Sequence, residues 1–175
     1  MGPRPGRHPR AAVGGGTALS LLLLDTTFLI DAERHAADLE ERISDDDDVA
    51  IAAVTVAELL VGVALATSDH HAARQAFVDD LLDVLPVLPY DLRVAEVHSN
   101  LLAATRRAGR PRGAHDLIIA ATAAASSRTI VTADPSGFEG LPGIPVATHK
   151  RLDSATSGRE VYPINDSERR FRWNT

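Results

Sequence analysis

The sequence predicts an α/β fold: a three-layer α/β/α sandwich with a mainly parallel central sheet of about five strands. Two observations support this prediction. Short apolar runs alternate with helical patterns along residues 21–150, and the connections between them are short. A strand inside a parallel sheet is buried on both faces, so it is apolar throughout, and a helix usually forms the crossover to the next strand.

The predicted strands are short apolar or β-branched runs between turn-forming residues. The first lies within Ser20–Asp25, where four leucines precede the acid. The third contains Pro86 and is followed by Pro89. Because proline cannot donate a ladder hydrogen bond, we expect this strand toward an edge of the sheet. The other strands, with the third, are predicted at Val49–Ala52, Val84–Leu88, Thr129–Thr132 and Ile144–Ala147.

The predicted helices fill the segments between these strands. Thr26 or Thr27 caps the first helix, which continues over Asp38–Ile43. Thr55 and Glu58 have the Ser/Thr-x-x-Glu spacing of a capping box, which would open a helix through Ala66. The remaining helices are predicted at His70–Leu82, Asp91–Arg107 and the alanine-rich His115–Ser126.

Length and composition limit the class of protein. The 175 residues suit one domain, expected at 21–150, between a flexible basic tail (1–20) and a flexible C-terminal extension (151–175). The absence of cysteine excludes disulfides, cysteine-ligated zinc and iron–sulfur clusters. The apolar run Ala18–Leu24 is too short to span a membrane, so we expect a cytoplasmic protein without membrane attachment.

Four acidic residues lie where the predicted strands end or where helices begin. Asp25 ends the first strand, and Glu58 lies in the first turn after the second. Asp116 begins the alanine-rich helix, and Asp134 follows the fourth strand. Because functional groups of open α/β sheets gather at the carboxyl ends of the strands, these four side chains can converge in one site.

Converging carboxylates repel one another, and one or more takes up a proton unless a cation lies between them. Carboxylate oxygens suit Mg²⁺, with Mn²⁺ as a substitute. Such an ion polarises a phosphoryl oxygen and lowers the pKa of bound water. The four acids therefore favour metal-assisted hydrolysis of a phosphodiester.

Each acid also has a structural interpretation. Glu58 completes the capping box, Asp116 complements the positive end of a helix dipole, and Asp134-Pro135 is a common turn dipeptide. Asp25 is the hardest to explain in this way, because a carboxylate that closes a buried strand needs a partner. The prediction of a site therefore depends on the joint placement of the four.

The charge distribution bears on whether the substrate is a nucleic acid. The formal net charge is −6, and residues 21–149 carry 20 acidic and only 9 basic side chains, which does not favour nucleic acid. Four of the nine, however, are Arg106, Arg107, Arg110 and Arg112, in a segment just before Asp116. Arginine binds phosphate through two donors, so this loop is a candidate RNA-binding element. The alternative is a solvated helix end.

Four segments of the chain carry a family resemblance. They are LLLDTTFLID (22–31), TVAELLVG (55–62), HDLIIAATA (115–123) and TAD (132–134), leading to Phe138 and Leu141-Pro142-Gly143. These segments resemble the PIN-domain family, and within it the VapC toxins of bacterial VapBC toxin–antitoxin systems. The resemblance covers about residues 21–150. The loop after Asp134 departs from the frequent Asn-containing version, which often bears Arg before Asp-Phe, so Asp134 as a cation ligand or a water-holding residue stays open.

The resemblance implies a Mg²⁺-dependent endoribonuclease toxin that cuts RNA needed for translation. The acidic quartet of the family falls on Asp25, Glu58, Asp116 and Asp134. Asp25 and Asp116 would bind the metal directly, Glu58 would hold or orient a water, and Asp134 would complete the site. The resemblance also implies inhibition by a cognate VapB-like antitoxin and assembly as a homodimer.

Two other functions remain open on the sequence alone. One is another metal-dependent α/β phosphohydrolase, such as a haloacid-dehalogenase-type phosphatase, although Asp25-Thr26-Thr27 lacks the Asp-x-Asp that this class requires. The other is a non-catalytic PIN-like module that binds RNA or protein, against which the intact acidic quartet argues.

Overall fold

The computed structural model describes residues 19–34 and 43–148, which form a five-stranded, entirely parallel sheet. The strand order is β3-β2-β1-β4-β5, so β1 lies at the centre, where Leu23 pairs with Ala50 of β2 and Ile130 of β4. The α/β fold class is confirmed, as is the edge position of the third strand. The strands are β1 (Leu21–Leu24), β2 (Asp48–Ala52), β3 (Val87–Leu88), β4 (Thr129–Thr132) and β5 (Val146–Thr148).

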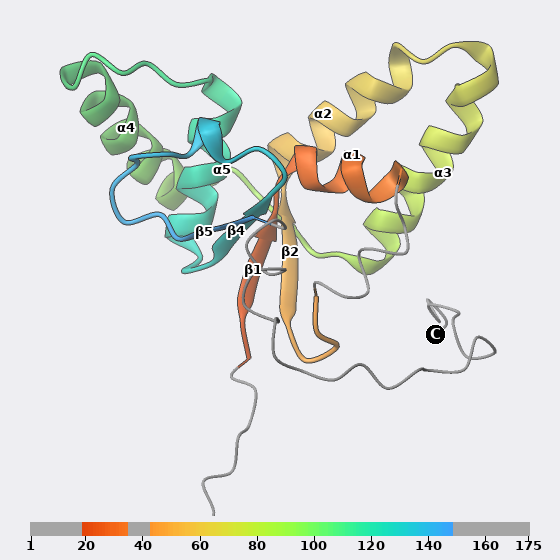
Figure 1. The fold of residues 1–175 in the computed structure, drawn as a ribbon, viewed down its shortest axis with the longest axis horizontal. Coiled ribbons are helices and arrows are strands. Elements are labelled where there is room, and N and C mark those ends of the chain that lie inside the picture. Colours follow the sequence, from red (N-terminus) through yellow and green to blue (C-terminus); the bar gives the residue numbers. More distant parts are fainter. Residues whose placement is uncertain (1–18, 35–42, 149–175) are drawn as a thin grey trace, which may run out of the picture.

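Helices cover both faces of the sheet (Figure 1). Consecutive side chains of a strand point to opposite faces, so Leu23 belongs to one apolar cluster with α4 and α5, whereas Leu22 and Leu24 belong to another with α1, α2 and α3. This double burial explains why β1 is apolar throughout. The helices are α1 (Thr26–Arg34), α2 (Ala53–Ala64), α3 (Ser68–Val84), α4 (Leu92–Arg107) and α5 (Ala114–Ala125). Among the described helices, none is both long and apolar enough to cross a bilayer.

Several predicted boundaries are wrong. α2 begins two residues before Thr55, β3 has two residues because α3 continues to Val84, and β5 begins at Val146 rather than at Ile144. The helical continuation over Asp38–Ile43 falls mostly outside the described residues, and Ile43 itself lies in no helix. Most of the predicted N-terminal tail and all of the C-terminal extension also lie outside the described residues.

Among α2, α3, α4 and α5, only α4 begins with a side-chain cap. α4 starts as predicted, because Asp91 accepts a hydrogen bond from the backbone N–H of Val94 at 2.9 Å. The predicted capping box is wrong: α2 follows β2 without a break, and Thr55 is buried inside the helix with no hydrogen-bond partner for Oγ1. Glu58 is therefore not a capping residue. Thr26 and Thr27 likewise lie within the first turn of α1 and donate to carboxylates instead of capping.

All strands run in the same direction, so their carboxyl ends lie at one edge of the sheet, here called the carboxyl edge. The chain leaves β1 at Asp25 to enter α1, leaves β2 directly into α2, and leaves β4 toward Asp134. α1 and α2 depart from this edge at the top of the sheet in Figure 1. The opposite edge, where the strands begin, is the amino edge. The topology thus gathers the predicted acids at the carboxyl edge.

Candidate active site at the carboxyl edge

Asp25 is a buried carboxylate held by two threonine hydroxyls. Its side chain is 4% exposed, and Oδ2 accepts from Thr27 Oγ1 at 2.6 Å and from Thr132 Oγ1 at 2.7 Å. The turn after β4 orients both hydroxyls, since Thr27 Oγ1 accepts from the N–H of Ala133 and Thr132 Oγ1 from the N–H of Asp134. A buried carboxylate needs hydrogen-bond partners, and these two hydroxyl groups supply them and fix the orientation of Asp25.

Glu58 lies on α2 and connects to two other helices. Its Oε2 accepts a hydrogen bond from Thr26 Oγ1 of α1, and its Oε1 lies 2.6 Å from His115 Nδ1 of α5. The Glu58 side chain remains 28% exposed. The carboxylate is therefore oriented by its neighbours while part of it still faces solvent.

Asp116 lies in the first turn of α5, and its carboxylate lies between Gly113 and Gly137, which belong to two different loops. A Cβ atom at Gly113 would lie 2.5 Å from Asp116 Oδ2, and one at Gly137 would lie 2.8 Å from the same oxygen. Both distances are too short for a real contact, so only glycine at these positions leaves room for the carboxylate. The loop before α5 and the loop after β4 thus form a close-fitting cradle for Asp116.

The electrostatics of Asp116 show that the four acids share this edge. Burial raises the pKa of Asp116 above its usual 3.8, and the negative charges of Asp25, Glu58 and Asp134 raise the pKa further, in that order. His115 opposes them weakly. Each of the three other acids therefore lies within electrostatic reach of Asp116. Protonation or a bound cation would relieve the repulsion.

Asp134 is the most exposed of the four acids. Its Oδ1 accepts from the backbone N–H of Ser136 at 3.0 Å, which caps the short 3₁₀ helix Pro135–Gly137. Hydrogen bonding by Ser136, first from its side chain and then from its backbone N–H, lowers the pKa of Asp134 below its usual value. The predicted turn role is therefore present. It does not exclude a role in the site, because Asp134 also raises the pKa of Asp116.

The donor set fits a magnesium-like ion held by two residues. Within residues 19–34 and 43–148, no three His, Asp or Glu side chains are arranged to bind one ion together. Glu58 is engaged with Thr26 and His115, and Asp134 with Ser136. Mg²⁺, however, usually binds through one or two carboxylates and keeps several waters. Asp25 and Asp116 supply two such oxygen donors where negative charge is in excess.

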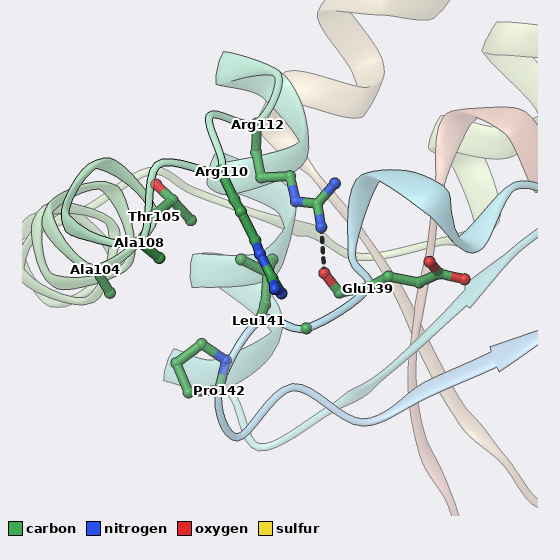
Figure 2. A pocket seen from close by; sticks show the side chains of 9 residues that line it. Ala104, Thr105, Ala108, Arg110, Arg112, Glu139, Leu141 and Pro142 are labelled. Carbon is green, nitrogen blue, oxygen red and sulfur yellow. Dashed lines mark hydrogen bonds between the residues drawn. The ribbon is translucent and has the colours of Figure 1, made fainter.

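The four arginines predicted to bind RNA have different environments. Arg112 is committed to the protein: Nη1 donates to the carbonyl of Ser136 at 3.1 Å, and Nη2 donates to the carbonyl of Glu139 (Figure 2). Arg106 and Arg107 are exposed in the last turn of α4, and Arg110 is exposed in the following loop. RNA contact by these residues stays a prediction.

Several residues of the site were missed by the sequence analysis. Thr27 and Thr132, whose hydroxyl groups orient Asp25, could have been found from their positions in the sequence. Thr27 follows Asp25 by two residues, and Thr132 ends β4. The cradle glycines, Gly113 and Gly137, could not have been found in this way, because their contact with Asp116 depends on how two distant loops pack. His115 could be placed beside Asp116 from the sequence, but its contact with Glu58 could not.

The comparisons with known proteins identify the family of the chain. The PIN-domain family profile matches residues 22–142. The chain is 37% identical to ribonuclease VapC5 of Mycobacterium tuberculosis over 122 residues, which are 69% of this chain and 87% of that protein. It is 28% identical to the tRNA(fMet)-specific endonuclease VapC of Salmonella typhimurium over 124 residues, 70% of this chain and 92% of the relative.

A solved structure supports the same relationship. The fold is similar to that in the crystal structure of VapBC-5 from Mycobacterium tuberculosis, a member of the VapBC family of toxin–antitoxin systems. The TM-score is 0.60 at 34% identity, covering 74% of this chain and 97% of that one. Family profile, sequence identity and fold agree. The chain therefore belongs to the PIN-domain family and, within it, to the VapC ribonuclease toxins of VapBC toxin–antitoxin systems.

Proposed function

We propose that this ribonuclease hydrolyses RNA with a divalent cation, Mg²⁺ or in its place Mn²⁺, bound by Asp25 and Asp116. The observation that carries the proposal is the raised pKa of Asp116, since burial and three neighbouring carboxylates disfavour its ionised form. A cation removes that penalty. When bound, it would polarise the scissile phosphate and make water more acidic.

The side chains around the cation site have distinct proposed roles. Thr27 and Thr132 fix the buried carboxylate of Asp25, so that its orientation does not depend on the ligand. Glu58 is proposed to hold the attacking water and accept its proton at a carboxylate oxygen, since its side chain is partly open to solvent. Asp134 completes the acidic edge, and Arg106, Arg107 and Arg110 are proposed to favour RNA over other phosphodiesters, whereas Arg112 already donates to the carbonyls of Ser136 and Glu139.

His115 is proposed as a positioning residue for Glu58. Its Nδ1 lies 2.6 Å from Glu58 Oε1, and its ring is 58% exposed. The contact fixes one Glu58 oxygen, while Thr26 fixes the other. Two anchors on two helices restrict the rotamers of Glu58, which is what the orientation of a water molecule requires.

The proposed biological role is that of a toxin that cuts RNA needed for translation. A named relative acts on tRNA(fMet), and a solved relative belongs to a VapBC system. By that similarity we propose a cognate VapB-like antitoxin as the inhibiting partner and a homodimer as the functional unit. Co-expression with the product of a small reading frame next to the gene tests the first, and the mass of the purified toxin in solution tests the second.

Two alternatives give different results in one experiment. The purified chain is incubated with total RNA in Mg²⁺, in Mn²⁺ and in EDTA, beside Asp116→Asn. Cleavage in Mg²⁺ that is lost in EDTA and in the variant supports the proposal. RNA binding without cleavage would favour the non-catalytic module, and hydrolysis of small phosphomonoesters with intact RNA would favour another phosphohydrolase. Cleavage that survives both EDTA and the substitution overturns the mechanism.

A further inference from the structure

A pocket lies next to the acid cluster but does not contain it. It is formed where the end of α4 faces the loop after β4, and its volume is about 220 Å³. None of the four site acids lines it. Figure 2 shows Arg110 extending from the loop after α4 toward Leu141, with Pro142 and α4 beside it. The lining includes Ala104, Ala108, Arg110, Leu141 and Pro142.

The same two loops build this pocket and the cradle of Asp116. In the loop before α5, Arg110 and Arg112 line the pocket, and Gly113 packs against the Asp116 carboxylate. In the loop after β4, Gly137 packs against Asp116, and residues 139–142 line the pocket. Arg112 joins the two loops by donating to carbonyls of the second. The pocket and the cradle of Asp116 are therefore formed by the same two loops.

The chemistry of the lining combines one free cation with apolar surface. In the part of the chain that the structure describes, the Arg110 guanidinium has no hydrogen-bond or ion-pair partner, in contrast to that of Arg112. Figure 2 shows the Glu139 carboxylate directed away from Arg110, so it does not neutralise the pocket. The surrounding alanine, leucine and proline side chains supply apolar surface.

A nucleotide fits this combination better than a bare anion or an apolar ligand. A guanidinium binds phosphate through two donors, and an unstacked RNA base is held against apolar, aromatic or guanidinium surfaces. An apolar ligand would leave Arg110 unpaired, and inorganic phosphate would leave the apolar wall unused. The mixed lining therefore indicates a ligand with both a charged group and a flat ring.

We propose that this pocket binds one nucleotide of the RNA substrate adjacent to the cleaved bond. Arg110 contacts its phosphate, and the wall formed by Ala108, Leu141 and Pro142 contacts its base. This inference rests on the proposed RNA hydrolysis and adds a specific subsite to it. It assigns different roles to the loop arginines, since Arg110 contacts substrate and Arg112 holds the two loops together.

The first test measures nucleotide binding without cleavage. Adenosine and uridine 5′-monophosphates are titrated in EDTA into the ¹⁵N-labelled full chain, and amide shifts are followed at Ala108, Gly140 and Leu141. We expect saturable shifts at these amides and a dissociation constant about tenfold higher in Arg110→Ala, because one charge-assisted contact is lost. Arg93→Ala, with the same charge change in the first turn of α4, should bind as the wild type does.

Two results of this titration overturn the inference. If ribose 5-phosphate produces the same shifts and affinity as the nucleotides, the pocket recognises phosphate alone and does not hold a base. If none of the ligands shifts these amides, the pocket is not a subsite. Amide spectra of both arginine variants in the absence of ligand show whether the fold is retained, so that a loss of binding is assigned to the side chain.

A second test separates this inference from the proposed function. In Mg²⁺, Arg110→Ala should raise KM for RNA cleavage about tenfold with kcat unchanged, whereas Arg93→Ala should change neither. Cleavage with an unaltered KM in Arg110→Ala overturns the subsite and leaves the hydrolysis standing. Pocket shifts with nucleotides but no RNA cleavage by the wild type would show that the pocket binds a nucleotide, and would overturn the hydrolysis together with the placement of the pocket beside a cleaved bond.

Discussion

Acidic side chains have different partners at the two edges of the sheet. At the amino edge, the protein supplies its own cation. Arg128, buried just before β4, donates from Nη2 to Asp48 Oδ1 at 2.9 Å and from Nη1 to the carbonyls of Asp48 at 2.6 Å and Leu22 at 3.1 Å. Asp47 beside it accepts from the backbone N–H of Ser20 at 3.2 Å. These acids join β1, β2 and β4 where the strands begin.

At the carboxyl edge, the acids are oriented but not neutralised. In the described part of the chain, none of the four site acids forms an ion pair with arginine or lysine, and threonine hydroxyls and backbone N–H groups are the main donors. The negative charge remains, as the raised pKa of Asp116 shows. The difference teaches that the charges of one edge are paired within the protein, whereas the other edge retains an excess of negative charge, where we propose that a cation binds.

The largest expected effect comes from removing a cation ligand. Asp25→Asn and Asp116→Asn should each lower RNA cleavage at least about 100-fold, because each neutral amide replaces one of two charged oxygen donors. Initial cleavage rates in Mg²⁺ measure the effect. Asp46→Asn, the same change on the exposed turn near the amino edge, is the matched control and should leave the rate unaltered. Equal losses in all three variants would remove the distinction between the edges.

Removing the contacts of Arg128 at the amino edge should lower the stability of the fold and leave the rate of RNA cleavage unchanged. Arg128→Met removes a buried cation and leaves carbonyls of β1 and β2 without their donor, which should lower the free energy of unfolding by about 2–4 kcal/mol. Asp48→Asn should cost less than about 1 kcal/mol, because the Asp48 side chain is 46% exposed. Urea unfolding measures both. Cleavage per folded molecule should be unchanged, and a selective loss of activity would contradict the division of roles.

Crowding the Asp116 cradle should act on cleavage with little effect on folding. Gly137→Ala places a Cβ 2.8 Å from the Asp116 carboxylate, so this side chain must move. A displaced ligand should lower the cleavage rate about 10- to 100-fold. Gly62→Ala is the control: a Cβ there meets nothing within 4 Å, and alanine favours the interior of α2. Thermal melting and cleavage assays compare the two, and full activity in Gly137→Ala would exclude a positional requirement at Asp116.

In the absence of metal, the excess negative charge at the carboxyl edge should make the stability of the protein depend on pH. Because the folded-state pKa of Asp116 lies above 3.8, the folded protein binds the extra proton, and stability should fall as the pH rises through the interval between 3.8 and that raised pKa. Melting temperatures in EDTA across this range measure it. Asp116→Asn should lose this slope and also the increase in melting temperature that Mg²⁺ gives the wild type. A wild type that gains no stability from Mg²⁺ would contradict cation binding.

The sequence predicts the sheet better than the site. Burial on both faces makes β1 apolar throughout, so both the strand and the acid at its end are visible in the sequence. The acidic quartet was predicted from the ends of the strands and the starts of the helices. The position of Glu58 is less predictable: its capping-box interpretation failed because α2 begins as soon as β2 ends.

Features that depend on packing between distant segments were not predictable. Gly137 contacts Asp116 across two loops, and Arg128 pairs with an acid 80 residues away. In a sequence, a single arginine before a strand and a glycine in a loop have no distinctive pattern. The functional edge was therefore predicted from its acids, whereas the groups that orient them, and the whole of the opposite edge, required the structure.

The smallest expected effect comes from substitution of Asp134, and it tests which acids of the carboxyl edge bind the cation. Asp134 is exposed, and its carboxylate already accepts from the N–H of Ser136. The side chain of Ser136, and then this N–H, lower the pKa of Asp134. Asn at this position keeps an acceptor for that N–H, so Asp134→Asn should lower cleavage by less than about tenfold, because a solvent-exposed charge is screened. Rates at low and high salt should converge with the wild type as screening increases. A loss as large as that of Asp116→Asn at both salt concentrations would instead make Asp134 a direct cation ligand, and three acids rather than two would then bind the ion.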